Sequence, residues 1–257
     1  MTATAARQAR AFSGSRYAWG TPVTAGEQLT VTGKAWQTAD AARSCRVDVE
    51  YHDAAGPLVN ATFSEDWTGT DGAAWDADWT TSHAGAATST IQSNAGRLTT
   101  GATAYTSSAR VYASGMGAVA DCEVTCLVVC SSTTAEMRGV VAVRTNGSFS
   151  GANPSHPTQG YWVEVDPQND IILIRRGDST VLATPGKTVP AEGLYVRLRA
   201  HGTTIAAKAW GATAQEPAVW DWVGEDSTWT AAGKVSLTAQ NGADAVSRNV
   251  TFDGLVV

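Results

Sequence analysis

The chain repeats one pattern along most of its length: short runs in which apolar and polar residues alternate, separated by turn-forming residues. In the run LYVRLRA at 194–200, the aliphatic residues fall on one side of an extended strand, and Tyr195, Arg197 and Arg199 fall on the other. Helical periodicity is almost absent. Such a chain folds into antiparallel sheets with one buried face each, because a parallel α/β fold would need helical crossovers.

The alternation predicts strands at 28–36, 45–51, 121–130, 138–144, 160–166, 170–175, 194–200, 205–210, 234–239 and 246–257. Turn residues separate these runs, and those at 167–170 and 201–202 predict hairpins. The expected fold class is therefore all-β: an antiparallel β-sandwich. A loss of periodicity near residues 60–66 predicts a smaller N-terminal β module at 1–60 and the main sandwich at 61–257.

Composition excludes several classes of partner. The net charge is −6, and only four of the 18 basic residues are lysine, so nucleic acid is not an expected partner. No apolar run approaches the ~20 residues that a membrane-spanning helix needs, and the opening residues show no secretion signal.

Three cysteines lie on one side of a predicted strand. Cys122, Cys126 and Cys130 alternate with valines in DCEVTCLVVC, which predicts buried, reduced thiols.

Several motifs carry a resemblance to a known family. Phe63, Asp66, Trp67, the pair Asp71-Gly72 and the pair Trp79-Thr80 are similar to the opening motif of concanavalin A-like lectin/glucanase (laminin G-like) sandwiches. The later segments 160–165, 194–200, 205–210 and 250–257 continue the likeness in the same order. The segment 17–56 resembles part of a carbohydrate-binding-module-like jelly roll.

This resemblance implies a role as well as a fold. Tandem modules of this kind occur in minor tail and fibre proteins of bacteriophages that infect actinobacteria, and the lysine-poor composition suits a high-GC coding bias. The resemblance thus implies a non-catalytic virion tail protein. It also implies a homo-oligomer, for which a trimer is one possible arrangement. Its expected partners are other tail proteins and host cell-wall polysaccharide. The alternative is a free extracellular or cell-surface lectin.

A glycoside hydrolase of the same fold is the less favoured alternative. Hydrolases with this sandwich resemble an E-x-D-x-x-E design on one strand, and retaining chemistry needs two carboxyl groups about 5 to 5.5 Å apart. Here Glu164 and Asp166 are followed by Asn169 where the second glutamate should be, and Pro167 ends the strand. We therefore expect no catalytic residues, and we interpret 167–170 as an Asx-type turn.

The candidate ligand residues come from two strands and two loops. Trp162, Glu164, Tyr195, Arg197 and Arg199 have the aromatic and planar polar character of a sugar-binding sheet, provided that their strands share a sheet. The alternative is that Trp162 covers a core edge and the arginines lie on a solvated face. By resemblance, Asp66 and Asp253 would share one structural calcium ion where the first and last strands meet; solvated loop acids are the alternative.

Overall fold

The structure, a computed structural model, describes residues 7–13, 17–23, 63–105, 107–150 and 156–257. By compactness the chain divides into two units, Met1–Val59 and Asn60–Val257. In the first unit, the described residues form one antiparallel hairpin of β1 (Arg7–Ser13) and β2 (Tyr17–Val23). The strands predicted at 28–36 and 45–51 lie outside the described residues, so a jelly-roll-like module at 1–60 stays a prediction.

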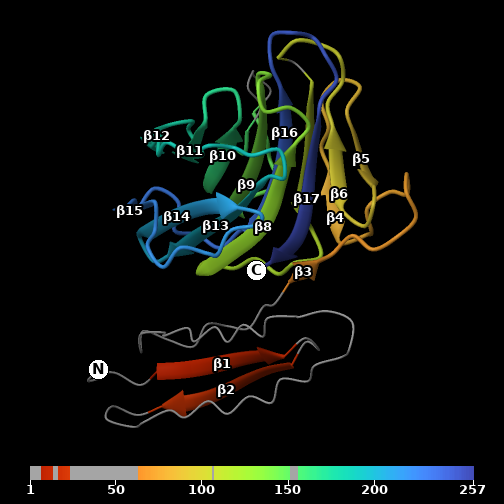
Figure 1. The fold of residues 1–257 in the computed structure, drawn as a ribbon. Helices are drawn as coiled ribbons and strands as arrows, with labels where there is room; N and C mark the ends of the chain where they lie inside the picture. Colours follow the sequence, from red (N-terminus) through yellow and green to blue (C-terminus); the bar gives the residue numbers. More distant parts are fainter. Residues whose placement is uncertain (1–6, 14–16, 24–62, 106, 151–155) are drawn as a thin grey trace. The chain divides into compact units, whose positions relative to one another are not determined.

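The second unit is a sandwich of two antiparallel sheets (Figure 1). One sheet has seven strands in the order β12 (Val181–Ala183), β11 (Ile171–Arg176), β10 (Tyr161–Asp166), β9 (Met137–Thr145), β16 (Lys234–Asn241), β7 (Ser108–Ala113) and β4 (Trp79–Thr81). The other has eight, in the order β15 (Trp222–Glu225), β14 (Thr204–Gly211), β13 (Leu194–His201), β8 (Cys122–Cys130), β17 (Asn249–Val256), β6 (Gly96–Thr99) and β5 (Thr88–Ile91), with β3 (Ser64–Glu65) also paired to β17. The described residues contain no helix, and hence none that could cross a membrane. The predicted all-β antiparallel sandwich is confirmed.

The predicted strands from residue 121 onward are all present, with no end shifted by more than three residues. The hairpin predicted at 167–170 joins β10 to β11, and the one at 201–202 joins β13 to β14. Alternation did not predict β4 to β7, because the segment 79–113 is rich in Thr, Ala and Ser and has few large apolar residues. The edge strands β12 and β15, of three and four residues, are too short to show a period.

The core lies between the sheets, and the three thiols of β8 are part of it. Cys122, Cys126 and Cys130 are free and buried, as predicted. Burial raises the pKa of the Cys122 and Cys130 thiols to about 12. These thiols are therefore protonated packing groups rather than nucleophiles or metal ligands.

Candidate functional site

The outward side of the seven-stranded sheet is polar and yet buried. On β10, the residues Tyr161, Val163 and Val165 point into the core, so Trp162, Glu164 and Asp166 share the opposite side, as predicted. On β16, the aliphatic residues likewise point inward. We call this opposite side of the seven-stranded sheet the outer face; its buried polar residues are Glu164, Asp166, Ser236, Thr238, Gln240 and Ser108.

Strand register arranges the outer face in rows that run across the sheet. Glu164 pairs with Val140, Val140 with Thr238, and Thr238 with Arg110, so these four residues form one row. Val140 lies in the middle of this row, and the flanking residues are polar or charged. Two buried hydroxyls on this face, Thr238 Oγ1 and Ser108 Oγ, have no hydrogen-bond partner among the described residues. Each such group costs about 1–3 kcal/mol, so a face that keeps them is suited to a ligand that supplies partners.

Glu164 is the most buried charge on the outer face. Its side chain is 0% exposed and lies between two arginines, with Oε1 at 3.0 Å from Arg138 Nε and Oε2 at 3.3 Å from Arg175 Nε. Burial raises the pKa of the Glu164 carboxyl, and the charges of Arg138 and Arg175 oppose that rise. The two ion pairs are therefore what keeps a carboxylate tolerable at this position.

Asp166, the second acid of β10, caps the following turn. It accepts hydrogen bonds from the backbone N–H of Asn169 at 3.3 Å and from Asn169 Nδ2 at 3.0 Å. Asp170 then takes a left-handed backbone conformation with φ of 50°. This is the Asx-type turn that the sequence predicts, and Asn169 acts as its donor.

The loop between β9 and β10 crosses the outer face. Its two described legs, 148–150 and 156–158, pair with each other through Ser150 N–H to His156 O (2.8 Å) and Thr158 N–H to Ser148 O (3.0 Å). We call these legs the strap. On the β7 side, Arg110 Nη1 donates to Ser150 O at 3.3 Å, and its guanidinium lies 5.4 Å from the centre of the Phe149 ring.

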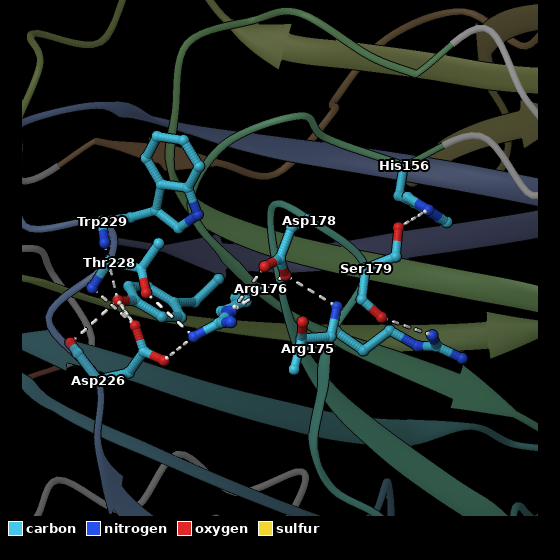
Figure 2. Close-up of polar contacts among 10 residues, drawn as sticks. His156, Arg175, Arg176, Asp178, Ser179, Asp226, Thr228 and Trp229 are labelled. Atoms are coloured by element: carbon cyan, nitrogen blue, oxygen red, sulfur yellow. Dashed lines mark hydrogen bonds and ion pairs between the residues drawn. The ribbon is translucent and has the colours of Figure 1, made fainter.

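At its other end the strap covers Trp162. The His156 ring stacks on Trp162 with centroids 5.3 Å apart, and Nε2 lies 2.5 Å from Ser179 Oγ (Figure 2). Burial, followed by the charges of Arg175 and Arg138, lowers the pKa of His156 to about 4, so the ring is neutral at pH 7. Trp162 itself is 0% exposed. In this conformation its ring offers no open platform to a sugar, and its ligand role stays a prediction.

A polar cluster at the sheet edge holds Ser179 and Arg175 in position (Figure 2). Asp226, in the β15–β16 loop, accepts hydrogen bonds from Tyr161 OH, Thr228 N–H and Arg176 Nη1, each at 2.8 Å. Arg176 Nε also donates to Asp178 at 3.0 Å. We call this group the clasp. It ties the loop that links the two sheets to β10 and β11, and so orients the turn that carries Ser179.

Tyr195, Arg197 and Arg199 lie elsewhere. They are on β13, in the eight-stranded sheet, so they do not form one surface with Trp162 and Glu164, because the condition of a shared sheet is not met. Both arginines are paired to carboxylates: Arg197 Nη1 lies 3.3 Å from Glu123, and Arg199 Nε lies 2.5 Å from it. A ligand role for the three stays a prediction for a separate surface.

The proposed calcium residues do not gather into a donor set. The first and last strands of the sandwich do meet, because β3 pairs with β17. However, Asp66 accepts a hydrogen bond from Thr68 Oγ1 at 3.2 Å, and Asp253 accepts one from Gly254 N–H at 2.8 Å. No group of three His, Cys, Asp or Glu side chains among the described residues could hold a metal ion. Calcium takes about six to eight oxygen ligands, which include backbone carbonyls and waters as well as carboxylates, so a structural calcium at Asp66 and Asp253 stays a prediction.

Sequence reasoning missed Arg138, Arg175, Thr238 and Ser108 as members of the outer face. A signal for Thr238 was visible, since VSLTAQ at 235–240 alternates aliphatic and polar residues inside a predicted strand. The arginines gave no such signal, because strand order decides which side chains flank Glu164.

No family model matches the sequence, and no curated protein matches it. Solved structures match the fold. A lichenase, a β-1,3-1,4-glucanase derived from a mouse hindgut metagenome, is 10% identical with a TM-score of 0.53, over 76% of this chain and 97% of its own. A β-1,3-glucanase from Mycobacterium marinum is 10% identical with a TM-score of 0.51, over 79% and 100%. The exoplasmic/lumenal domain of VIP36, bound to Ca²⁺ and Man3GlcNAc, is 12% identical with a TM-score of 0.50, over 70% and 82%. At such identities the likeness shows the fold alone, which is the concanavalin A-like sandwich.

Proposed function

We propose that this protein is a non-catalytic, lectin-like component of a virion tail that binds host cell-wall polysaccharide through the outer face. The observation that carries the proposal is the buried polar character of that face. Thr238 and Ser108 keep hydroxyls without partners among the described residues, while the opposite side of the same sheet is apolar. Saccharide hydroxyls both donate and accept hydrogen bonds, so they are suitable partners for these groups. Because both hydroxyls are buried in this conformation, as Trp162 is, the proposal requires the outer face to open to the ligand.

The matched structures support a glycan as the ligand class. Two of them are named as glucanases, and the VIP36 domain holds a mannose-containing glycan. The sequence resemblance supports the other parts of the proposal. These are the tail location, the partnership with other tail proteins, and a homo-oligomer, for example a trimer. A free extracellular lectin is the alternative, and the presence or absence of the protein in purified virions distinguishes the two.

The absence of catalysis is part of the proposal. Glu164 is paired to two arginines, and Asp166 accepts hydrogen bonds from Asn169. A general acid needs a carboxyl that carries a proton, and a nucleophile needs a free carboxylate. Among the described residues of β10 and its turn, Glu164 and Asp166 therefore do not form the pair of a proton donor and a free nucleophile that a retaining hydrolase needs.

The first experiment measures binding of the full chain to host-type cell walls and their soluble polysaccharides, with calcium and with a chelator. We expect saturable binding that Thr238→Val weakens several-fold, because the ligand loses one buried hydrogen bond. Thr251→Val is the matched control, since Thr251 lies on β17 of the other sheet. Failure of the wild-type chain to bind any wall polymer would overturn the proposal. Release of reducing sugar from β-glucans, abolished by Glu164→Gln, would overturn its non-catalytic part.

A further inference from the structure

The two arginines that flank Glu164 use only part of their donor capacity. Arg138 reaches its carboxylate partners through Nε alone, at 3.0 Å from Glu164 and 3.4 Å from Asp166. Arg175 Nε lies 3.3 Å from Glu164 Oε2 as an ion pair without hydrogen-bond geometry, and Nη1 donates to Ser179 O at 3.2 Å. Both Nη groups of Arg138 and Nη2 of Arg175 have no partner among the described residues. The side chains are 24% and 17% exposed, so these donors are accessible from solvent.

Glu164 lies between the two guanidinium groups and is the ion-pair partner of both. Each of its oxygens faces the Nε of one arginine, and the carboxylate is fully buried between them. A buried charge is tolerated only with close partners, so both arginines are held against it. Their terminal nitrogens are thereby left for a second anion, and a guanidinium fork matches the geometry of carboxylate and phosphate groups.

The local charge balance also favours an anion. The outer face carries the positive residues Arg110, Arg138, Arg175 and Lys234 and the negative residues Glu164 and Asp166, which is four minus two, or +2, in a chain whose net charge is −6. The charges of Arg175 and Arg138 add to burial in lowering the pKa of the neighbouring His156. The unpartnered donors of Arg138 and Arg175, together with this charge balance, therefore indicate positive potential at this place.

From these observations we infer that Arg138 and Arg175 form an anion-recognition pair braced by Glu164, and that the bound glycan carries carboxylate or phosphate groups. The inference rests on the proposed function and names the ligand class of the same face. Uronic acid polymers and polyol-phosphate wall polymers share this chemistry. Glu164 is a positioning residue in this arrangement and does not touch the ligand.

The test is calorimetric titration of the full chain with three defined oligomers: a uronate, a glycerol phosphate and a neutral β-glucan of equal length. We expect one of the two anionic oligomers to bind at least tenfold more tightly than the neutral one, with affinity falling as salt rises. The preferred anion identifies the source. Arg138→Gln and Arg175→Gln should each weaken that binding about tenfold or more. Arg248→Gln, the same charge change in the 242–248 loop, should leave it unchanged.

Glu164→Gln separates positioning from simple attraction. This substitution makes the outer face more positive, so charge attraction alone would strengthen anion binding. If Glu164 positions the two arginines, its loss instead weakens anion binding, and this is the result we expect. Tighter binding would overturn the brace. If the arginine variants unfold, Arg138→Lys keeps the charge without the fork and should still lose affinity. Equal or tighter binding of the neutral oligomer overturns the inference and leaves the proposed function standing, whereas no binding of any oligomer defeats the proposed function itself.

Discussion

The clasp allows a quantitative test of how the site is supported, through the single change Tyr161→Phe. The Tyr161 hydroxyl is directed at Asp226 Oδ1 (2.8 Å) and accepts from Trp229 N–H at 3.1 Å. Burial, with the hydrogen bond to Asp226, raises the pKa of this phenol to about 12, so it is a neutral donor at all working pH values. Its removal deletes one hydrogen bond to a charged acceptor and leaves the Trp229 N–H without its partner.

The magnitude follows from these two losses. A hydrogen bond to a charged group contributes about 1.5–3 kcal/mol, so we expect the free energy of unfolding to fall by about 2 kcal/mol. For a unit of about 200 residues, this lowers Tm by about 4–8 °C. Urea and thermal unfolding followed by near-ultraviolet circular dichroism measure the change. Tyr112→Phe is the control, because the described residues offer the Tyr112 hydroxyl no hydrogen-bond partner. A Tyr161→Phe loss no greater than that of the control would refute the assignment of the clasp.

The same cluster predicts a pH dependence. Burial alone would raise the pKa of Asp226, but hydrogen bonds from Thr228, Tyr161 and Arg176 outweigh it and lower the pKa to about 2. A carboxyl with a depressed folded-state pKa stabilises the fold above its ordinary value of 3.8, and that contribution is lost as the pH falls toward 2. Its size is about 2 kcal/mol, from roughly 1.4 kcal/mol per pKa unit. Asp226→Asn should remove this part of the dependence between pH 4 and pH 2.

Three further predictions test the outer face, the β9–β10 junction and the core. Thr238→Val should raise the free energy of unfolding by about 1 kcal/mol while it weakens glycan binding, because it removes a buried hydroxyl without a partner; lower stability by urea titration would contradict this. Gly160→Ala should cost at least about 2 kcal/mol, because Gly160 has φ of +96° and an added Cβ would lie 2.2 Å from Val143 O. Gly186→Ala, with open space around it, is the control, and equal effects in a thermal melt would refute the argument. The Cys45→Ser variant leaves Cys122, Cys126 and Cys130 as the cysteines of the chain. Their thiols should react with a disulfide reagent at neutral pH only after unfolding, and fast labelling of the folded variant would show that β8 is exposed.

The sequence predicted the sandwich, because alternation is a local property and β8, β10, β13 and β16 each show it clearly. It also predicted the Asx-type turn at 167–170, since Asn169 could be identified directly as a turn residue. It could not predict which strands are neighbours. The pairing of Arg138 and Arg175 with Glu164 depends on β9 and β11 lying on either side of β10, and the separation of Tyr195 from Trp162 depends on the sheets to which their strands belong. The stacking of His156 on Trp162 depends on the path of the loop between β9 and β10, and the alternation of apolar and polar residues does not predict the path of a loop.

The four strands at the edges of the two sheets limit how copies of this chain can assemble. They have three residues in β4 and β12 and four in β5 and β15, whereas the inner strands β8 and β9 have nine each. An edge of three or four residues offers few unpaired backbone groups to a strand from another molecule, so side-by-side joining of sheets gains little free energy. Copies held at high local density would thus remain separate sandwiches instead of merging into a continuous sheet. If the chain forms the proposed homo-oligomer, its sandwiches would join through side-chain surfaces.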